Sequence, residues 1–300
     1  MLTALRSKLR KALAGFGRGL GSFVIHFWPC IRREEYDVPV HILVSSSSWH
    51  CGLLAAISLE TLCEKNWRFV FHEDGSVTEA QKGQILKTLP GVRFISRFEA
   101  DEKMSRFLSD YPLCGAHRSR HNFFLKIFDI PAFVEGTKFL LLDSDVMFFQ
   151  RPSEILDWAT SENEGIFFNE DTQEKYSSPR SEIENQIGFQ LHRNFNSGLV
   201  LMQSKAFDLR LAESLLSKFE HSAHHPQFFE QTLYCVMASA WGRGQALSER
   251  YEINWGYFRS RGAICRHYVG AFKHDLLYIE GSTLLFLRLM PALLKRLLGS

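Results

Sequence analysis

The stretch that decides the fold is Phe139-Leu-Leu-Leu-Asp143-Ser-Asp145-Val-Met-Phe-Phe149. An apolar run passes directly into two carboxylates that stand two positions apart, and a second apolar run follows them. This pattern predicts a buried strand over residues 138–142 that ends at Asp143. Ligands of open α/β sheets bind beyond the carboxyl ends of the strands, so a functional site is expected at this point.

Asp143 and Asp145 have apolar neighbours on both sides, and a carboxylate in such surroundings is unstable unless something compensates its charge. A divalent cation would do so. Oxygen ligands suit Mg²⁺ or Mn²⁺, which would in turn hold a diphosphate. The alternative is a strand-to-turn junction with solvated aspartates, because a bare Asp-x-Asp is common. The position directly after an apolar strand favours the metal site.

Strand and helix patterns alternate along the chain around this stretch. Strands are expected at 40–45, 67–72, 92–96, 138–142, 165–168 and 198–202. Helices are expected at 53–63, 78–89, 122–128, 205–219 and 227–239, and a polar loop at 171–194. Thr78 and Gln81 have the spacing of a capping box. The alternation predicts one α/β domain over 37–275 with a mostly parallel central sheet.

Composition narrows the classes of function. The chain has 300 residues, enough for one large domain, and its formal net charge of +2 gives no support to nucleic-acid binding. Its six cysteines include no Cys-x-x-Cys pair, which favours free thiols in a reducing, cytoplasmic compartment. No apolar run reaches the roughly 18 residues that indicate a transmembrane helix.

Both ends of the chain are amphipathic. In the basic segment 1–36, leucines and Phe16 recur every three or four positions, and the first 20 residues hold five cations and no acid. The tail 276–300 is apolar with interspersed cations. We expect the N-terminal segment to dock on an anionic membrane surface, as a peripheral association with the inner face. The alternatives are packing on the domain, pairing of the two ends, or a partner protein.

A second candidate cluster lies near the end of the domain, at His267-Tyr-Val-Gly270-Ala-Phe-Lys273. A histidine could complete a metal site through a ring nitrogen, and a glycine would let the backbone approach a phosphate closely. Lys273 could meet a diphosphate as a point charge. The alternative is a histidine and a lysine on an ordinary surface.

Two other clusters have competing interpretations. His221, His224 and His225 resemble a zinc trio but lack partner cysteines, and a solvated loop is the favoured interpretation. Arg118 and Arg120 could bind a phosphate or an acidic acceptor, and they could equally be solvated.

The order of the motifs over residues 38–275 resembles that of glycosyltransferase family 8, which includes glycogenin and bacterial lipopolysaccharide sugar transferases. The similarity consists of short motifs in the family's order: Phe-Leu-Leu-Leu-Asp-Ser-Asp145, Phe195-Asn-Ser-Gly198 and the heptad ending at Lys273. This resemblance implies the GT-A fold, the Rossmann-like α/β fold of nucleotide-diphospho-sugar transferases. It also implies transfer with retention of the anomeric configuration.

The resemblance assigns a metal-ligand role to three residues, Asp143, Asp145 and His267. It places two residues, Gly270 and Lys273, at the donor diphosphate. The cation would be Mn²⁺ or Mg²⁺.

The remaining roles concern the sugar and the base. The donor-sugar pocket would be lined by Asn196, Ser197 and Gly198, with Asn254 in the same area. The catalytic residues beside the transferred sugar would be Lys126, Glu230 and Gln231. Trp49 would stack on the uracil base. This chain departs from the family in three places. Glu230 replaces an aspartate, and Ser47 stands where many members carry an aspartate for the base. Lys273 is followed by His-Asp, where the family often has Pro-Trp.

The function expected from the sequence is metal-dependent transfer of a sugar from a UDP-sugar to a hydroxyl of a glycan, lipid or protein acceptor. One rival is a nucleotidyltransferase of similar fold, which would want a glycine-rich basic loop near the first strand. Residues 45–49 (Ser-Ser-Ser-Ser-Trp) do not supply one. The other rival is a non-catalytic sugar-nucleotide-binding protein that has kept the fold.

Overall fold

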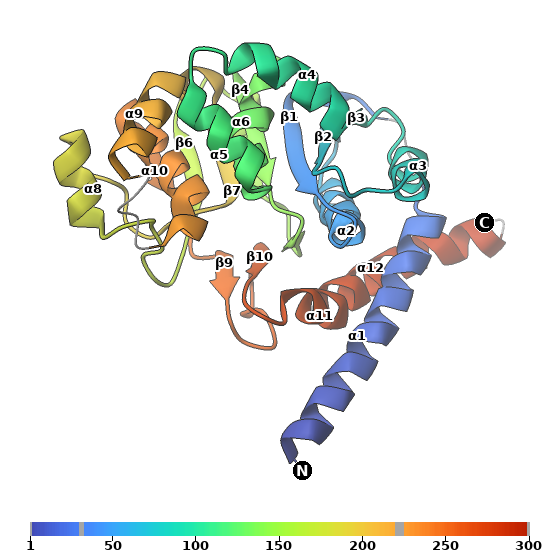
Figure 1. Ribbon diagram of the computed structural model, residues 1–300. Coiled ribbons are helices and arrows are strands. Elements are labelled where there is room, and N and C mark those ends of the chain that lie inside the picture. The colour runs from blue at the N-terminus through green and yellow to red at the C-terminus, as the bar shows by residue number, and fades with distance from the viewer. Residues whose placement is uncertain (1, 30–32, 220–224, 299–300) are drawn as a thin grey trace.

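A computed structural model describes residues 2–29, 33–219 and 225–298. Its central sheet has seven strands within these ranges, in the order β3-β2-β1-β4-β7-β6-β8 (Figure 1). Their bounds are β1 (Glu35–Val44), β2 (Asn66–Glu73), β3 (Arg93–Ile95), β4 (Lys138–Leu142), β6 (Ile166–Glu170), β7 (Phe195–Gln203) and β8 (Gly244–Ala246). Only β7 runs antiparallel to its neighbours, so the mostly parallel sheet is confirmed.

Helices cover both faces of this sheet (Figure 1). Those before Asp143 in the sequence are α2 (Trp49–Glu60), α3 (Glu79–Thr88), α4 (Arg97–Phe107), α5 (Pro112–Arg120) and α6 (Phe123–Ala132). Those after it are α7 (Ser153–Thr160), α8 (Arg180–Ile187), α9 (Leu209–Phe219) and α10 (Phe229–Trp241). The capping box of α3 is confirmed, because Thr78 and Gln81 exchange side-chain and backbone hydrogen bonds of 3.0 and 3.3 Å.

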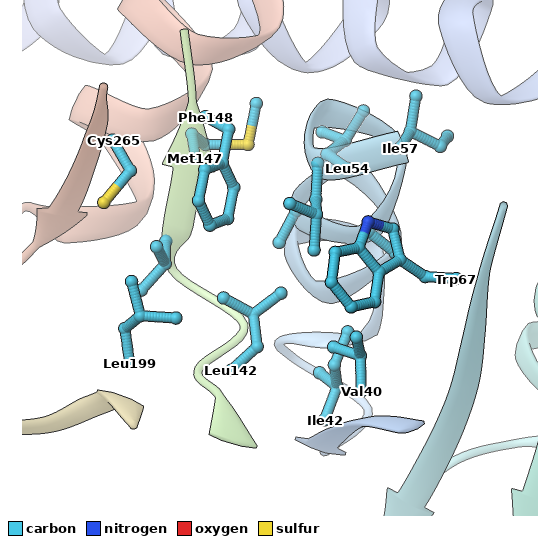
Figure 2. Packing of buried hydrophobic residues seen from close by; sticks show 14 of the residues in the cluster. Val40, Ile42, Leu54, Ile57, Trp67, Leu142, Met147, Phe148, Leu199 and Cys265 are labelled. Atoms are coloured by element: carbon cyan, nitrogen blue, oxygen red, sulfur yellow. The ribbon is translucent and has the colours of Figure 1, made fainter. Parts of the chain in front are cut away.

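The core has two parts, one on each face of the sheet. Side chains alternate along every strand, so Leu140 and Leu142 of β4 join one cluster while Phe139 and Leu141 join the other. Figure 2 shows the first cluster, where β1 and β4 pack on α2 and on the short strand β5 (Val146–Phe148). Burial on both faces explains why β4 reads as a continuous apolar run.

A second, three-stranded sheet lies beside the central one, in the order β5-β10-β9. It contains β9 (Tyr251–Asn254) and β10 (Cys265–Tyr268), which run parallel, and β5, which is antiparallel to β10. None of these three strands was expected from the sequence, since three or four residues are too few to show a period. Because β5 follows Asp145 and pairs with β10, this sheet brings the segment 267–273 close to Asp143 and Asp145.

Several expectations for the second half need correction. The stretch 171–194 is not all loop, because it contains α8, whose end is set by Gly188 in the left-handed conformation (φ 82°). The helices expected at 205 and 227 begin later, after the 3₁₀ turns η1 (Ser204–Ala206) and η2 (Pro226–Phe228). For α9 the reason is Asp208, whose carboxylate accepts from the backbone N–H of Arg210 at 2.8 Å.

The structure also describes part of the arginine and histidine clusters that the sequence analysis singled out. Arg118 is a buried structural residue, since its guanidinium binds Asp129 at 2.6 and 2.8 Å and Asp101 at 2.7 Å. The phosphate-binding interpretation is therefore wrong for Arg118. His221 and His224 lie outside the described residues, and the backbone N–H of His225 donates to the carbonyl of Ser177 at 2.8 Å.

The cysteines within the described ranges carry free, buried thiols, as expected: Cys51, Cys63, Cys114, Cys235 and Cys265. Burial raises the pKa of the Cys51 and Cys63 thiols to about 11. These thiols therefore stay protonated and unreactive near neutral pH.

The two ends of the chain pack against each other. The helix α1 (Leu2–Phe27) lies on the π-helical turn η3 (Leu277–Ser282) and on α12 (Thr283–Leu298), and Arg10 binds Asp275 of α11 (Lys273–Leu276) at 2.9 Å. Small residues make this contact, since a Cβ at Gly17 would collide with the carbonyl of Tyr278. The helix buries Gly17, Gly21 and Val24 and exposes Leu5, Leu9 and Phe16. In the described part of the chain, no helix has both the length and the apolar character that a bilayer crossing demands.

His41 of β1 and His72 of β2 form a buried pair, with His41 Nδ1 2.9 Å from His72 Nε2. Burial lowers the pKa of His41 to about 3 and holds the pKa of His72 well below its ordinary value. Both rings stay neutral in the folded protein, whereas the unfolded chain takes up protons on them below a pH of about 6.5. Their contribution to stability is therefore complete above that pH and is lost as the pH falls toward 3.

Replacing both histidines, His41→Leu with His72→Leu, is expected to flatten the acid side of the stability profile. Below a pH of about 6.5 each neutral histidine removes up to about 1.4 kcal/mol of unfolding free energy per pH unit, and the variant lacks this dependence. Urea unfolding at about pH 5 and pH 7 measures the difference in slope. Equal pH slopes in the two proteins would contradict the account.

Candidate active site

The segment Asp143-Ser-Asp145 connects the two sheets. The N–H of Asp143 donates to the carbonyl of Gly198 on β7 at 2.7 Å, which continues the ladder of the central sheet. The carbonyl of Asp145 accepts from the N–H of Tyr268 at 2.9 Å, and Val146 pairs with His267 across β5 and β10. The crossover between the sheets therefore places both aspartates beside the second motif.

Asp143, Asp145 and His267 form one cluster, in which the ligand atoms of all three lie within 4.8 Å of one another. His267 Nε2 is 3.2 Å from Asp145 Oδ1 and 3.9 Å from Asp143 Oδ2. Asp145 and His267 are buried, while Asp143 is partly open to solvent. The structure thus brings together the three residues expected to bind a metal, more than 120 positions apart in the sequence.

The tautomer of His267 is fixed by Asn196. The side-chain N–H₂ of Asn196 donates to Asp171 and Gln231 at 3.3 Å, so its Oδ1 is the acceptor that lies 3.0 Å from His267 Nδ1. Nδ1 of His267 therefore carries a proton, and Nε2 faces the two carboxylates. A neighbour that holds the non-ligating nitrogen in this way is usual for metal-binding histidines.

The donor atoms of the cluster fit a divalent cation. Asp145 Oδ1 is buried, and His267 Nε2, at 3.2 Å, is the polar atom that faces it, although a buried carboxylate oxygen without full compensation is energetically costly. Two carboxylates and one imidazole nitrogen suit Mn²⁺ or Mg²⁺. Asp143, Asp145 and His267 would hold such an ion.

Lys273 lies at the mouth of the cluster, with Nζ 2.7 Å from Asp145 Oδ2 and a half-exposed side chain. Burial alone would raise the pKa of Asp145, but His267 and Lys273 outweigh burial and hold this pKa below its ordinary value. Asp145 in turn raises the pKa of Lys273. Both groups are therefore charged at neutral pH, and the ammonium remains accessible to an anion from solvent.

Lys126 of α6 links the cluster to α10. Its Nζ is 2.7 Å from Asp143 Oδ1, 3.3 Å from Glu230 Oε1 and 3.2 Å from Ser197 Oγ. Burial would lower the pKa of Lys126, but Asp143 and Glu230 raise it. Burial also raises the pKa of Glu230 against the opposing charge of Lys126. The ammonium is therefore retained in a buried network because two carboxylates face it.

Gly198 allows the imidazole to pack directly on β7. A Cβ at this position would overlap the His267 ring, reaching within 2.5 Å of Nδ1. The preceding residue, Ser197, also points into the site, since its Oγ donates to Glu230 Oε2 at 3.0 Å. β7 is a buried strand whose pairing with β6 is irregular between Asn196 and Val200, and this part of the strand presents three consecutive site residues, Asn196 to Gly198.

Gln231 uses its hydrogen-bonding groups to fix its neighbours. Its Oε1 accepts from Asn196 Nδ2 and from the N–H of Ser197, both at 3.3 Å, and its Nε2 donates to the carbonyl of Lys175 at 2.7 Å. The side chain therefore ties α10 to β7 and to the segment after β6. This arrangement positions Asn196, which in turn orients His267.

The three remaining expected residues have different surroundings. Trp49 is half-buried at the start of α2, one turn before Gly52, where a Cβ would lie 3.4 Å from Ser144 Cβ. Gly270 lies within the second motif, in the left-handed conformation (φ 86°). Asn254 directs its amide into the turn that follows β9, binding the N–H of Gly256 and the carbonyl of Phe258. Its hydrogen bonds stabilise that turn and do not reach the metal cluster.

Two participants were missed by the sequence reasoning. Asp171 is buried, accepts from Asn196 Nδ2 at 3.3 Å and binds Lys175 Nζ at 3.1 Å. It is the first residue of the polar stretch 171–194, which was interpreted as a loop, and nothing in that stretch indicated a buried carboxylate. Trp255 is exposed and lies against Gly270, and its position next to the expected Asn254 was the only available hint.

Several solved glycosyltransferases have a fold similar to that of this chain. Galactosyltransferase LgtC, in complex with donor and acceptor sugar analogs, superposes with a TM-score of 0.51 at 15% identity, over 78% of this chain and 87% of its own. Mouse xyloside xylosyltransferase 1 gives 0.52 at 14% identity, over 78% and 97%. Core-mannan synthase A from Aspergillus fumigatus, in its Mn/GDP form, gives 0.50 at 11%, over 86% and 85%.

No protein-family model matches the sequence, and no curated protein matches it significantly. The structural similarity nevertheless confirms the expected fold, since these neighbours are GT-A glycosyltransferases and the mixed seven-stranded sheet is shared. The fold of this chain is therefore the GT-A fold. Membership of family 8 stays a prediction.

Proposed function

We propose that this protein is a metal-dependent glycosyltransferase that moves a sugar from a UDP-sugar to an acceptor hydroxyl. The observation that carries the proposal is the cluster of Asp143, Asp145 and His267, with Nε2 of the imidazole directed at the two carboxylates. A cluster of this composition at the carboxyl end of β4 suits a cation that binds a diphosphate.

A Mn²⁺ or Mg²⁺ ion bound there would act as a Lewis acid toward the diphosphate leaving group. Lys273 adds a positive charge at the open side of the cluster, where it would stabilise the charge that develops on the departing diphosphate. Asn196 and Gln231 hold His267 in its ligating orientation.

Glu230 is proposed to orient the transferred sugar and to stabilise positive charge near its anomeric carbon. Both of its carboxylate oxygens are engaged, Oε1 with Lys126 and Oε2 with Ser197. This engagement favours a positioning and electrostatic role over that of a free nucleophile. Retention of configuration is proposed from the resemblance to family 8.

The donor base is proposed to be uracil, stacked on Trp49. The support is the half-buried indole at the start of α2, on the helix whose Gly52 lies beside Ser144. The acceptor is proposed to be a hydroxyl of a glycan, a lipid or a protein. Among the structural neighbours, core-mannan synthase A is described in a Mn/GDP form and LgtC with donor and acceptor sugar analogs.

A thermal-shift screen of UDP-, GDP- and dTDP-sugars, each with and without Mn²⁺, tests the proposal. At a donor concentration of 100 times the dissociation constant, binding adds about 2.7 kcal/mol of stability, and this gain should require UDP-sugar and Mn²⁺ together. Release of UDP in the presence of an acceptor mixture then measures turnover. Metal-independent stabilisation would argue against the donor site, and binding without UDP release would favour the non-catalytic rival.

We also propose that α1 attaches the enzyme peripherally to an anionic membrane on the cytoplasmic side. The first half of α1 projects away from the two sheets (Figure 1) and exposes Leu5, Leu9 and Leu13 among cations without any acid. Apolar side chains would enter the interface while the cations meet anionic headgroups, each worth about 1 kcal/mol.

Replacing Leu5, Leu9 and Leu13 together by serine is expected to reduce binding to vesicles at least about tenfold, because three apolar anchors are lost. Co-sedimentation with phosphatidylcholine vesicles, with and without phosphatidylglycerol, measures this. A matched control is Phe98→Ser, since Phe98 is a 79% exposed apolar residue on α4. Equal sedimentation of the triple variant and the wild type would contradict the proposal.

A further inference from the structure

Trp255 is an exposed indole that the mechanism proposed above does not use. It follows β9, is 55% exposed, and rests on the backbone of the second motif at Gly270. A Cβ at Gly270 would lie 2.8 Å from Trp255 Cζ3, and the φ of 86° also disfavours any other residue. Gly270 belongs to the segment that joins His267 to Lys273, so the indole lies against the backbone between these two site residues.

The turn that contains Trp255 is held in place by a buried arginine. Arg266 is fully buried, and its Nη2 donates to the carbonyls of Asn254 and Gly256, which flank Trp255 on both sides. Its Nη1 binds Glu280 at 2.7 Å, and the other oxygen of Glu280 accepts from the N–H of Arg259 at 2.8 Å. Arg266 and Glu280 thus hold the backbone on both sides of Trp255 in place. A ligand that stacks on the indole therefore costs less conformational entropy of the protein.

A polar chain connects the indole to the metal ligands. Lys175 Nζ lies 4.6 Å from the centre of the Trp255 ring and binds Asp171 at 3.1 Å. Asp171 accepts from Asn196, whose Oδ1 orients His267. Trp255 is therefore an exposed residue that is linked through Lys175 and Asp171 to the buried site residue Asn196.

We propose that Trp255 is the platform on which a sugar ring of the acceptor stacks. The proposal rests on the proposed glycosyltransferase function. The transferred sugar belongs with the buried residues Asn196, Ser197 and Glu230, whereas the indole lies further out, where a molecule arriving from solvent meets the site. The negative face of an indole attracts the weakly positive C–H groups of a pyranose ring. The acceptor class this selects is a pyranoside with one apolar face.

Ligand-observed saturation-transfer NMR tests the assignment with four probes, the methyl α- and β-pyranosides of D-glucose and D-galactose. Each is measured on the full chain in the presence of UDP and Mg²⁺, which avoids paramagnetic broadening. The wild type should transfer saturation to the ring protons of at least one pyranoside. Trp255→Ala should weaken that binding about tenfold, while Trp255→Phe keeps most of it.

The matched control is Tyr257→Ala, a 63% exposed aromatic residue of the same turn, which should bind the pyranoside like the wild type. Unchanged pyranoside binding in Trp255→Ala, or no pyranoside binding to the wild type, would overturn the assignment. Loss of the UDP signals in Trp255→Ala would also overturn it, since the ring would then serve the nucleotide. Absence of UDP binding to the wild type counts instead against the proposed function.

Discussion

Asp145→Ala is expected to lower sugar-transfer turnover by about a thousandfold, because it removes the buried carboxylate that faces His267 and binds Lys273. The fold should survive, since Lys273 is half-exposed and can be solvated when its partner is removed. UDP release in the presence of donor, acceptor and Mn²⁺ measures turnover, and circular dichroism checks the fold.

The matched control for Asp145→Ala is Glu162→Ala, which removes an exposed carboxylate after α7 and should leave turnover unchanged. If Asp145→Ala retained turnover within a few-fold of the wild type, the metal-ligand role of this residue would be refuted.

Gly198→Ala is expected to reduce Mn²⁺-dependent UDP binding by about a hundredfold, although it adds only one methyl group. The φ of Gly198 lies outside the left-handed range, so the backbone accepts alanine. The new Cβ would overlap the His267 ring and drive it away from Asn196 and the carboxylates. Calorimetric titration of UDP with Mn²⁺ measures the change.

Gly115→Ala provides the control for Gly198→Ala, because a Cβ at Gly115 in α5 has nothing within 4 Å. It should bind UDP like the wild type and be as stable or slightly more stable, since alanine favours a helix. Wild-type UDP affinity in Gly198→Ala would show that the ring position does not matter for the site.

The aspartates could be predicted from sequence because one local pattern contains everything needed. The apolar run 138–142 predicts a buried strand, and the end of a strand is where a ligand site is expected in this fold class. The partnership with His267 could not be derived from spacing, because it depends on the antiparallel pairing of β5 with β10. Strands of three or four residues carry no measurable period. The residue type made His267 a candidate ligand, and the order of motifs in the family that this chain resembles linked it to the aspartates.

The N-terminal helix shows a second limit. Its leucine stripe predicts an amphipathic helix, and α1 is one, but the pattern does not say which side is buried. The side that packs on η3 contains Gly17 and Gly21, since close approach of two backbones requires small residues. Leu5, Leu9 and Leu13 remain exposed.

Polar residues that act through other polar residues were the hardest to find. Asp171 sits in a charged stretch that resembles a solvated loop, and its burial follows only from its contacts with Asn196 and Lys175. Arg118 illustrates the converse, because a basic residue interpreted as a candidate phosphate ligand is buried against Asp129. Charge in a sequence does not reveal whether its partner lies inside the fold or in a ligand.

The most direct test of the central claim is electron paramagnetic resonance of Mn²⁺ titrated into the protein with UDP, comparing the wild type with Asp145→Ala and His267→Ala. The account predicts one protein-bound Mn²⁺ per chain in the wild type, strengthened by UDP, and a large loss of bound Mn²⁺ in both variants. Equal Mn²⁺ binding by all three proteins would contradict the claim that Asp143, Asp145 and His267 form the metal site.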